Sequence, residues 1–300
     1  MELLSALPGA VAQGLIWGIM AIGVYITFRI LDIADLTVDG SICTGATVCA
    51  MLMINGTPVW LALIAATLAG IVAGALTGAL HIFLGIPAIL SGILTQLVLW
   101  SVNLKIMGKA NQPLSARNYK VLLSQMDIPW AIVILAICSV LLVVVLYLFF
   151  GTELGASIRA TGINAAMSRA QGINTDIAKL IGLALSNGIV AFSGALLCQY
   201  QGYADISMGR GAVVIGLAAV VIGEAMISKL PPNFAIRLSG VILGAVIYYI
   251  VYQVIIFIGL DPDLLKMFSA IVVAVFLGAP YIKKKIASRR GIQKEGKTNA

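Results

Sequence analysis

"AIVILAICSVLLVVVLYLFF", residues 131–150, is a run of twenty residues without one charged side chain. Wound as an α-helix, such a run is long enough to cross a hydrocarbon layer roughly 30 Å thick. Similar runs recur along the 300 residues, and only 10% of the chain is charged, far below the roughly one quarter typical of soluble domains. The alternating ten-residue segments of a transmembrane β-barrel are not found. The sequence therefore predicts an all-α, polytopic transmembrane helical bundle.

Hydropathy windows of about 19 residues predict about eight to ten spans. The nine segments lie near 9–30, 38–54, 58–84, 86–108, 129–150, 176–200, 207–227, 236–259 and 264–282. They form one predicted transmembrane domain, residues 1–282, followed by a basic tail, residues 283–300.

The distribution of positive charge predicts the orientation. The net charge is +7, and seven of the nineteen basic residues follow Ile282, which is typical of the cytoplasmic face rather than of nucleic-acid binding. Counting back four crossings places residues 151–175 in the cytoplasm and residues 109–128 outside. Lys109 and Lys120 in that outer loop run against the positive-inside trend. We expect a multi-pass protein of the cell membrane with a cytoplasmic C-terminus.

Motifs for catalysis are missing from the sequence. It contains no G-x-x-x-x-G-K-[ST] phosphate loop, no H-E-x-x-H zinc motif and no G-x-S-x-G elbow. The four cysteines lie within apolar segments and lack the spacing of metal ligands. We therefore expect no catalytic residue, no metal site and no cofactor bound by this chain.

A glycine stripe marks the third predicted span. Gly70, Gly74 and Gly78 are four residues apart, so they share one helix face, and small residues at this spacing let helices approach closely in lipid. Packing within the chain is one interpretation, and contact with a second copy is the other.

Two short segments resemble each other across the chain. "ADLTVDG" at 34–40 is echoed by "ADISMGR" at 204–210, so that Asp35 and Thr37 match Asp205 and Ser207. Five predicted spans separate the two segments, and an odd number makes them face opposite ways, as in an inverted internal repeat. The four residues either line a translocation path or gate, or simply cap helices at the membrane surface.

Residues 155–174, "GASIRATGINAAMSRAQGIN", read as a short polar helix between two apolar runs. A helix lying on lipid would carry more lysine and bulkier apolar residues. Alanine and glycine instead favour close docking against another protein, and we predict a cytoplasmic coupling helix within residues 151–175.

Residues 151–196 resemble the coupling region of permeases in ATP-binding-cassette (ABC) importers of the branched-chain amino acid and ribose type. The family pattern runs roughly T-x-x-G-x-x-I-R-A-x-G-x-N, then a short helix, then G-I-N or G-I-D. "DLTVDG" resembles the family's D-L-[ST]-x-G stretch, with Asp39 intervening before Gly40. The likeness spans nearly the whole chain and is greatest to permeases of tryptophan and tyrosine uptake systems. The positions carried over to ATPase coupling are Gly155, Arg159, Ala160, Gly162, Asn164, Gly172, Ile173 and Asn174.

The resemblance implies a division of labour. Two permease copies would form the pore in the lipid bilayer, a separate cytoplasmic ATPase would bind ATP and hold the coupling helices, and an extracellular solute-binding protein would deliver the solute. That solute is expected to be an amino acid, with an aromatic one suggested, and no nucleic acid is involved. The residues alone leave two rivals open, an ion-coupled secondary transporter and a membrane scaffold that transports nothing.

Overall fold

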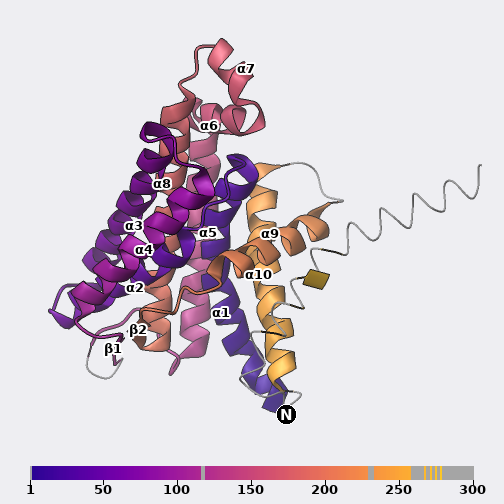
Figure 1. Cartoon of the computed structure of the whole chain (residues 1–300). Helices are drawn as coiled ribbons and strands as arrows, with labels where there is room; N and C mark the ends of the chain where they lie inside the picture. The colour runs from indigo at the N-terminus through magenta and orange to yellow at the C-terminus, as the bar shows by residue number, and fades with distance from the viewer. Residues whose placement is uncertain are drawn as a thin grey trace, which may run out of the picture.

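A computed structural model describes residues 2–115, 119–228 and 233–257, together with the single positions 267, 271, 274, 275 and 278. Its described part is helical apart from one short strand pair (Figure 1), which agrees with the all-α expectation. The long helices are α1 (Glu2–Tyr25), α3 (Val59–Phe83), α4 (Ala88–Met107), α5 (Ile128–Gly151), α8 (Thr175–Gln201) and α10 (Phe234–Phe257). The shorter elements are the π-helical turn η1 (Ile26–Ile30), α2 (Val38–Ile54), β1 (Asn111–Pro113), α6 (Glu153–Ile163), α7 (Ala165–Ala170), β2 (Tyr203–Asp205) and α9 (Ala212–Ile227).

Six helices of the described part are long and apolar enough to cross a membrane, fewer than the eight to ten spans expected. The predicted spans at 38–54 and 207–227 correspond to α2 and α9, which have 17 and 16 residues. At 1.5 Å per residue each is about 25 Å long, short of a hydrocarbon core about 30 Å thick. Hydropathy counts apolar residues but does not detect the backbone breaks before these two helices. The predicted span at 264–282 and the tail at 283–300 lie outside the continuously described residues.

Helices α1 and α8 form the centre of the bundle. In the most apolar part of each span, 78% of the residues are buried in the α1 span and 72% in α8. The corresponding share in α5 is 22%. α3 packs along α8, α10 packs along α1, and α2 packs against both α3 and α8. The outer faces of α3, α4 and α5 carry exposed leucine, isoleucine and valine, which suits contact with lipid.

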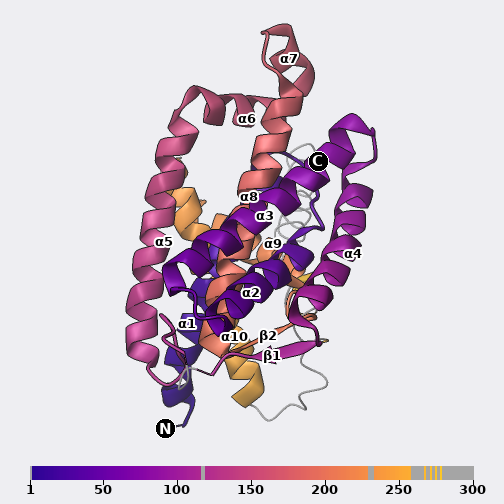
Figure 2. The ribbon, with the colours of Figure 1, turned by 90° about the vertical axis from the view of Figure 1, so that its left-hand side faces the viewer.

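The two similar segments, 34–40 and 204–210, lie in two halves of the fold that are built alike. Helices α1 and α8 run in opposite directions (Figures 1 and 2), and each is followed by a break, a short helix and a long helix. The long helix of each half packs against the central helix of the other half. Two copies related by a two-fold axis in the membrane plane would give this crosswise arrangement.

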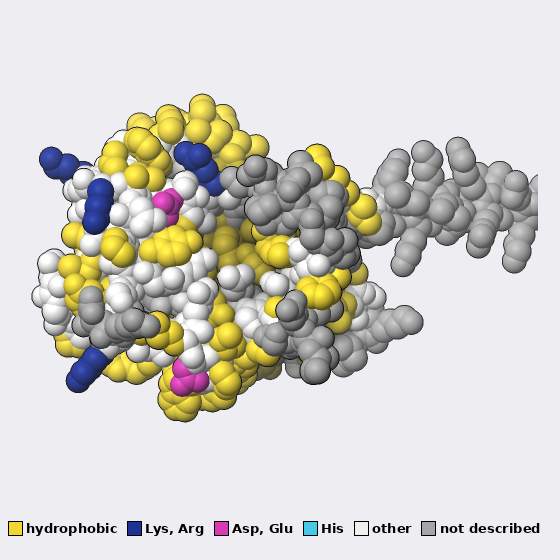
Figure 3. All heavy atoms as spheres, turned by 90° about the horizontal axis from the view of Figure 1, so that it is seen from below, with side chains coloured by type: hydrophobic (Ala, Val, Ile, Leu, Met, Phe, Trp, Pro, Cys, Tyr) yellow, Lys and Arg dark blue, Asp and Glu magenta, His cyan; other side chains and the backbone are white. Residues whose placement is uncertain are grey.

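One end of the molecule is closed by β1 and β2, which pair antiparallel with Gln112 opposite Ala204. The other end carries α6 and α7, which project beyond the bundle (Figure 2). The end with β1, viewed in Figure 3, shows scattered charged side chains among apolar and uncharged groups.

Candidate functional site

The predicted coupling segment is two short helices joined at a sharp turn. The Asn164 side chain accepts a hydrogen bond from the Met167 N–H at 3.0 Å, so one residue ends α6 and caps α7. Gly172 then turns the chain with a φ of 83°, a conformation that favours glycine. Asn174 caps α8 by accepting from the Asp176 and Ile177 N–H groups, each at 3.1 Å. The two asparagine caps and the turn at Gly172 thus define where α6 and α7 end and where α8 begins.

Helix α6 packs closely against the bundle at two glycines, Gly155 and Gly162. A side-chain carbon at Gly162 would collide with the backbone of Ile30 and Leu31, where η1 ends. A side-chain carbon at Gly155 would collide with the backbone of Phe149 and Phe150 at the end of α5. α6 therefore lies directly on the backbone at the ends of η1 and α5, with no flexible side chain between them.

The outer face of α6 and α7 carries several exposed side chains in the described part of the chain. Ile163 is 86% exposed and Met167 58% exposed, and Arg159 of α6 and Arg169 of α7 are exposed as well. Among the other predicted coupling residues, Asn164, Gly172 and Asn174 are exposed, whereas Ala160 and Ile173 are half-buried. An exposed apolar and basic face at the tip of a projecting unit has the composition of a protein-docking surface.

A basic hollow lies beneath α6, and the sequence analysis did not predict it. Arg29, Arg159 and Arg237 line a cavity of about 370 Å³ together with Tyr25 and aliphatic and aromatic neighbours. The Arg29 Nε lies 2.7 Å from a Glu224 carboxylate oxygen. Because these residues come from three stretches far apart in sequence, around Arg29, Arg159 and Arg237, no local motif indicates them.

Asp35 lies at the level of the middle of α8, fully surrounded by protein. Its carboxylate accepts from the Thr37 N–H at 2.8 Å and from the Asn187 amide at 2.7 Å. The Asn187 oxygen accepts in turn from the Ser41 hydroxyl at 2.6 Å. Thr37 continues the network to Thr77 at 2.7 Å, and no ion pair to Asp35 is present among the described residues.

Asp205 makes the same local turn at the surface. It accepts from the Ser207 N–H at 2.7 Å, as Asp35 does from Thr37, and from the Asn111 amide at 3.1 Å. Partial burial opposes ionisation, but hydrogen bonds from the Ser207 hydroxyl, the Ser207 N–H and the Asn111 amide, with the nearby charge of Arg210, outweigh it and hold the pKa of Asp205 below its usual value. The two halves of the predicted gate are therefore not equivalent, because Asp35 is buried whereas Asp205 is half-buried at the surface.

Asp39, which interrupts the family-like stretch, joins the two halves of the fold. Its carboxylate accepts from the N–H groups of Gly211 and Val213, at 3.1 and 3.0 Å, so a residue of α2 caps α9. Sequence reasoning missed this role because more than 170 positions separate donor and acceptor.

The glycine stripe faces α8. A side-chain carbon at Gly70 or Gly74 would collide with the backbone at Asn187 and Leu183, and one at Gly78 would meet the Leu180 side chain. This face of α3 is therefore filled within the chain.

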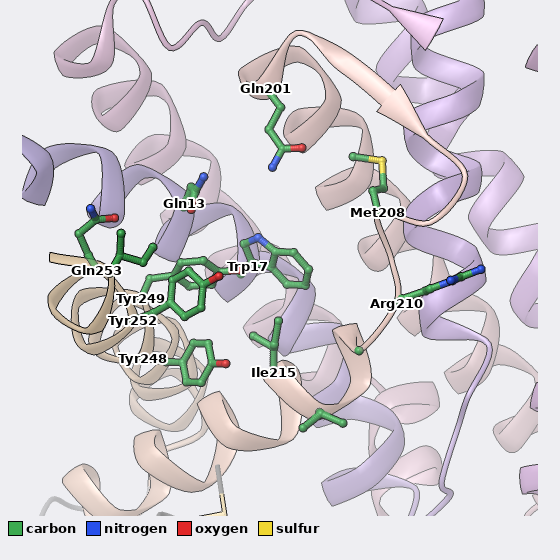
Figure 4. Close-up of a pocket in the computed structure, with 13 residues that line it drawn as sticks. Gln13, Trp17, Gln201, Met208, Arg210, Ile215, Tyr248, Tyr249, Tyr252 and Gln253 are labelled. Carbon is green, nitrogen blue, oxygen red and sulfur yellow. The ribbon is translucent and has the colours of Figure 1, made fainter. Parts of the chain in front are cut away.

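A cleft of about 720 Å³ opens between α1, α9 and α10 near the β1–β2 end (Figure 4). Trp17, Tyr248, Tyr249 and Tyr252 line it, and three glutamines share the wall with them: Gln13, Gln201 and Gln253. The sequence analysis identified none of these residues, since single aromatic residues in apolar helices resemble ordinary packing.

Comparison with known proteins places the chain in a family. Residues 7–279 match the family model described as the permease component of branched-chain amino acid transport systems. The tyrosine transport system permease protein of Clostridioides difficile is 38% identical over 91% of each chain. The uncharacterised protein RP368 of Rickettsia prowazekii is 35% identical over 90% of this chain and 96% of its own.

Among solved structures, PsaBC from Streptococcus pneumoniae in complex with Fab matches 84% of this chain and 94% of its own, with 13% identity and a TM-score of 0.42. The family match covers the bundle and the projecting α6–α7 unit alike. This chain belongs to the family of branched-chain amino acid transport system permease components and is the multi-pass, non-catalytic permease subunit of an ABC transporter.

Proposed function

We propose that the chain forms the translocation path of an importer for an amino acid, and that the solute is aromatic. The similarity to a permease named for tyrosine transport supports this substrate class. Membership of an ABC permease family favours an ATP-driven transporter over an ion-coupled carrier or a scaffold.

The projecting α6–α7 unit is the observation that carries the coupling role. Its exposed Ile163 and Met167 offer apolar contact to a cytoplasmic ATPase, and Arg159 offers charge. The contact of Gly162 with Ile30 and Leu31 then passes movement of the ATPase to α1. We propose that closure of the ATPase dimer displaces α6 and so switches the pore between its inward and outward states.

The remaining partners follow from the same proposal. A second copy of the chain completes the pore, and an extracellular solute-binding protein delivers the amino acid at the end formed by β1 and β2. The C-terminus lies in the cytoplasm, on the side of α6 and α7.

Reconstitution tests the proposal directly. The chain is placed in proteoliposomes with its ATPase and binding protein, and uptake of radiolabelled L-tyrosine is measured with ATP inside. We expect accumulation that needs ATP and is unaffected by ionophores. Uptake driven by a sodium or proton gradient without the ATPase would contradict the proposal.

A further inference from the structure

The cleft between α1, α9 and α10 contains a continuous aromatic wall. The ring centroids of Trp17 and Tyr249 are 5.9 Å apart, those of Tyr248 and Tyr249 5.6 Å, and those of Tyr249 and Tyr252 6.0 Å. These separations fall within the 4.5–7 Å at which aromatic rings attract each other edge to face or offset. Another planar ring entering the cleft would extend this cluster (Figure 4).

The glutamines of the cleft are the second, independent observation. Gln13, Gln201 and Gln253 come from three different helices, and all three side chains line the same space. None of their amides forms a hydrogen bond to another described residue, although all three side chains are half-buried and polar groups withdrawn from water are normally paired. Facing lipid, they would be costly to leave unpaired. The cleft therefore suits water or a polar solute rather than acyl chains.

From these two observations we propose that the cleft is a binding site for an aromatic amino acid, which rests on the importer function proposed above. The ring of the amino acid packs against the aromatic wall, and the glutamine amides form hydrogen bonds with its ammonium and carboxylate groups. A volume of about 720 Å³ lies in the range of about 300–1,000 Å³ usual for small-molecule sites. The cleft lies near the β1–β2 end, where the solute arrives under the proposed orientation.

Arg210 also lines the cleft, but its side chain extends away from the rings in Figure 4. It lines the small cavity beside Asp39 as well. We therefore assign it no contact with the bound ring.

Photolabelling tests the site. The full chain in lipid nanodiscs is irradiated with the aryl azide 4-azido-L-phenylalanine, and modified peptides are found by mass spectrometry. We expect modification of the peptides that contain Trp17 or residues 248–253, and we expect excess L-tyrosine, but not L-leucine, to prevent it. Modification confined to other peptides, or insensitive to L-tyrosine, would overturn the proposal.

Two variants and a matched control sharpen the experiment. Tyr252→Leu removes a half-buried ring of the wall, and Gln253→Leu removes one amide. Each should reduce protected labelling about five- to tenfold, the size of one lost aromatic contact or one hydrogen bond. Tyr147→Leu, on the exposed face of α5, should leave labelling unchanged. Equal labelling in all three variants would contradict the proposal.

Uptake measurements separate failure of the site from failure of the proposed function. The measured quantity is the L-tyrosine concentration that gives half-maximal uptake. If wild-type uptake is normal and this concentration is unchanged in both cleft variants, the site is refuted and the importer function still stands. A wild-type assembly that imports no amino acid, but whose cleft is still labelled and protected by L-tyrosine, would refute the importer function and leave the site standing.

Discussion

Asp35 and Asp205 occupy matching positions in two similar segments, yet their surroundings differ at the scale of single residues. Both accept the N–H two residues ahead, as expected for an acid before a helix start. Asp35 is 5% exposed and bonds Asn187, whereas Asp205 lies at the surface. The local turn was predictable from sequence. The Asn187 partner was not, because 152 positions separate it from Asp35.

This difference predicts unequal effects of one substitution. Asp35→Asn turns an acceptor facing the Asn187 amide into a donor, leaving buried polar groups unpaired at a cost of about 1–3 kcal/mol. Asp205→Asn, at a half-buried turn, keeps an oxygen for the Ser207 N–H but loses the acceptor for the Asn111 amide, so it should cost less, about 0.5–1 kcal/mol. The unfolding temperatures of the two purified variants are compared with that of the wild type. An equal decrease in both would mean that the Asp35 network adds no extra stability.

Gly74 gives a second prediction at this scale. Gly74→Ala places a carbon against the Leu183 backbone and the Asn187 Cβ of α8, and overpacking of this kind costs about 1–3 kcal/mol. Gly151→Ala is the control, since nothing lies within 4 Å of its added carbon. A lower unfolding temperature for Gly74→Ala alone is expected. If stability is unchanged and association between copies is altered, the glycine face contacts a second copy of the chain instead of α8.

At the scale of elements, sequence predicted the helices better than their lengths. Apolar runs placed eight of the nine predicted spans on helices, because burial in lipid needs little beyond length and hydropathy. The brevity of α2 and α9 follows from backbone breaks, and the capping of α9 by Asp39 depends on tertiary contact. The cleft was missed for the same reason, since its wall is assembled from four helices, α1, α8, α9 and α10.

The α6–α7 unit carries the prediction at this scale. Arg159→Glu reverses an exposed charge on the docking face without removing a buried contact, so stability should be unchanged. Copurification of the ATPase should fall at least about tenfold, the effect of placing like charge in a close interface. Lys105→Glu makes the same charge change on exposed α4 and should have no effect. Retained ATPase binding in Arg159→Glu would contradict the docking role.

At the scale of the whole molecule, the proposed mechanism depends on which side of the membrane each end faces. α6 and α7 project at one end, and β1 and β2 close the other (Figures 1 and 2). ATP is available only in the cytoplasm, so the end with α6 must face inward for an ATPase to move it. The arginine-lined hollow beneath α6 agrees with that side, because basic residues concentrate on the cytoplasmic face. Lys105, Lys109 and Lys120, toward the other end, oppose this orientation.

Cysteine labelling of intact cells decides between the two orientations. Met167→Cys on α7 and Lys109→Cys before β1 introduce thiols at exposed positions of opposite ends. Three native cysteines, Cys43, Cys49 and Cys198, are buried, so the background should be low. A membrane-impermeant maleimide should label Lys109→Cys in intact cells and Met167→Cys only after the membrane is opened. The reverse pattern would place α6 and α7 outside the cell, where no ATPase reaches them, and the coupling mechanism would then be untenable.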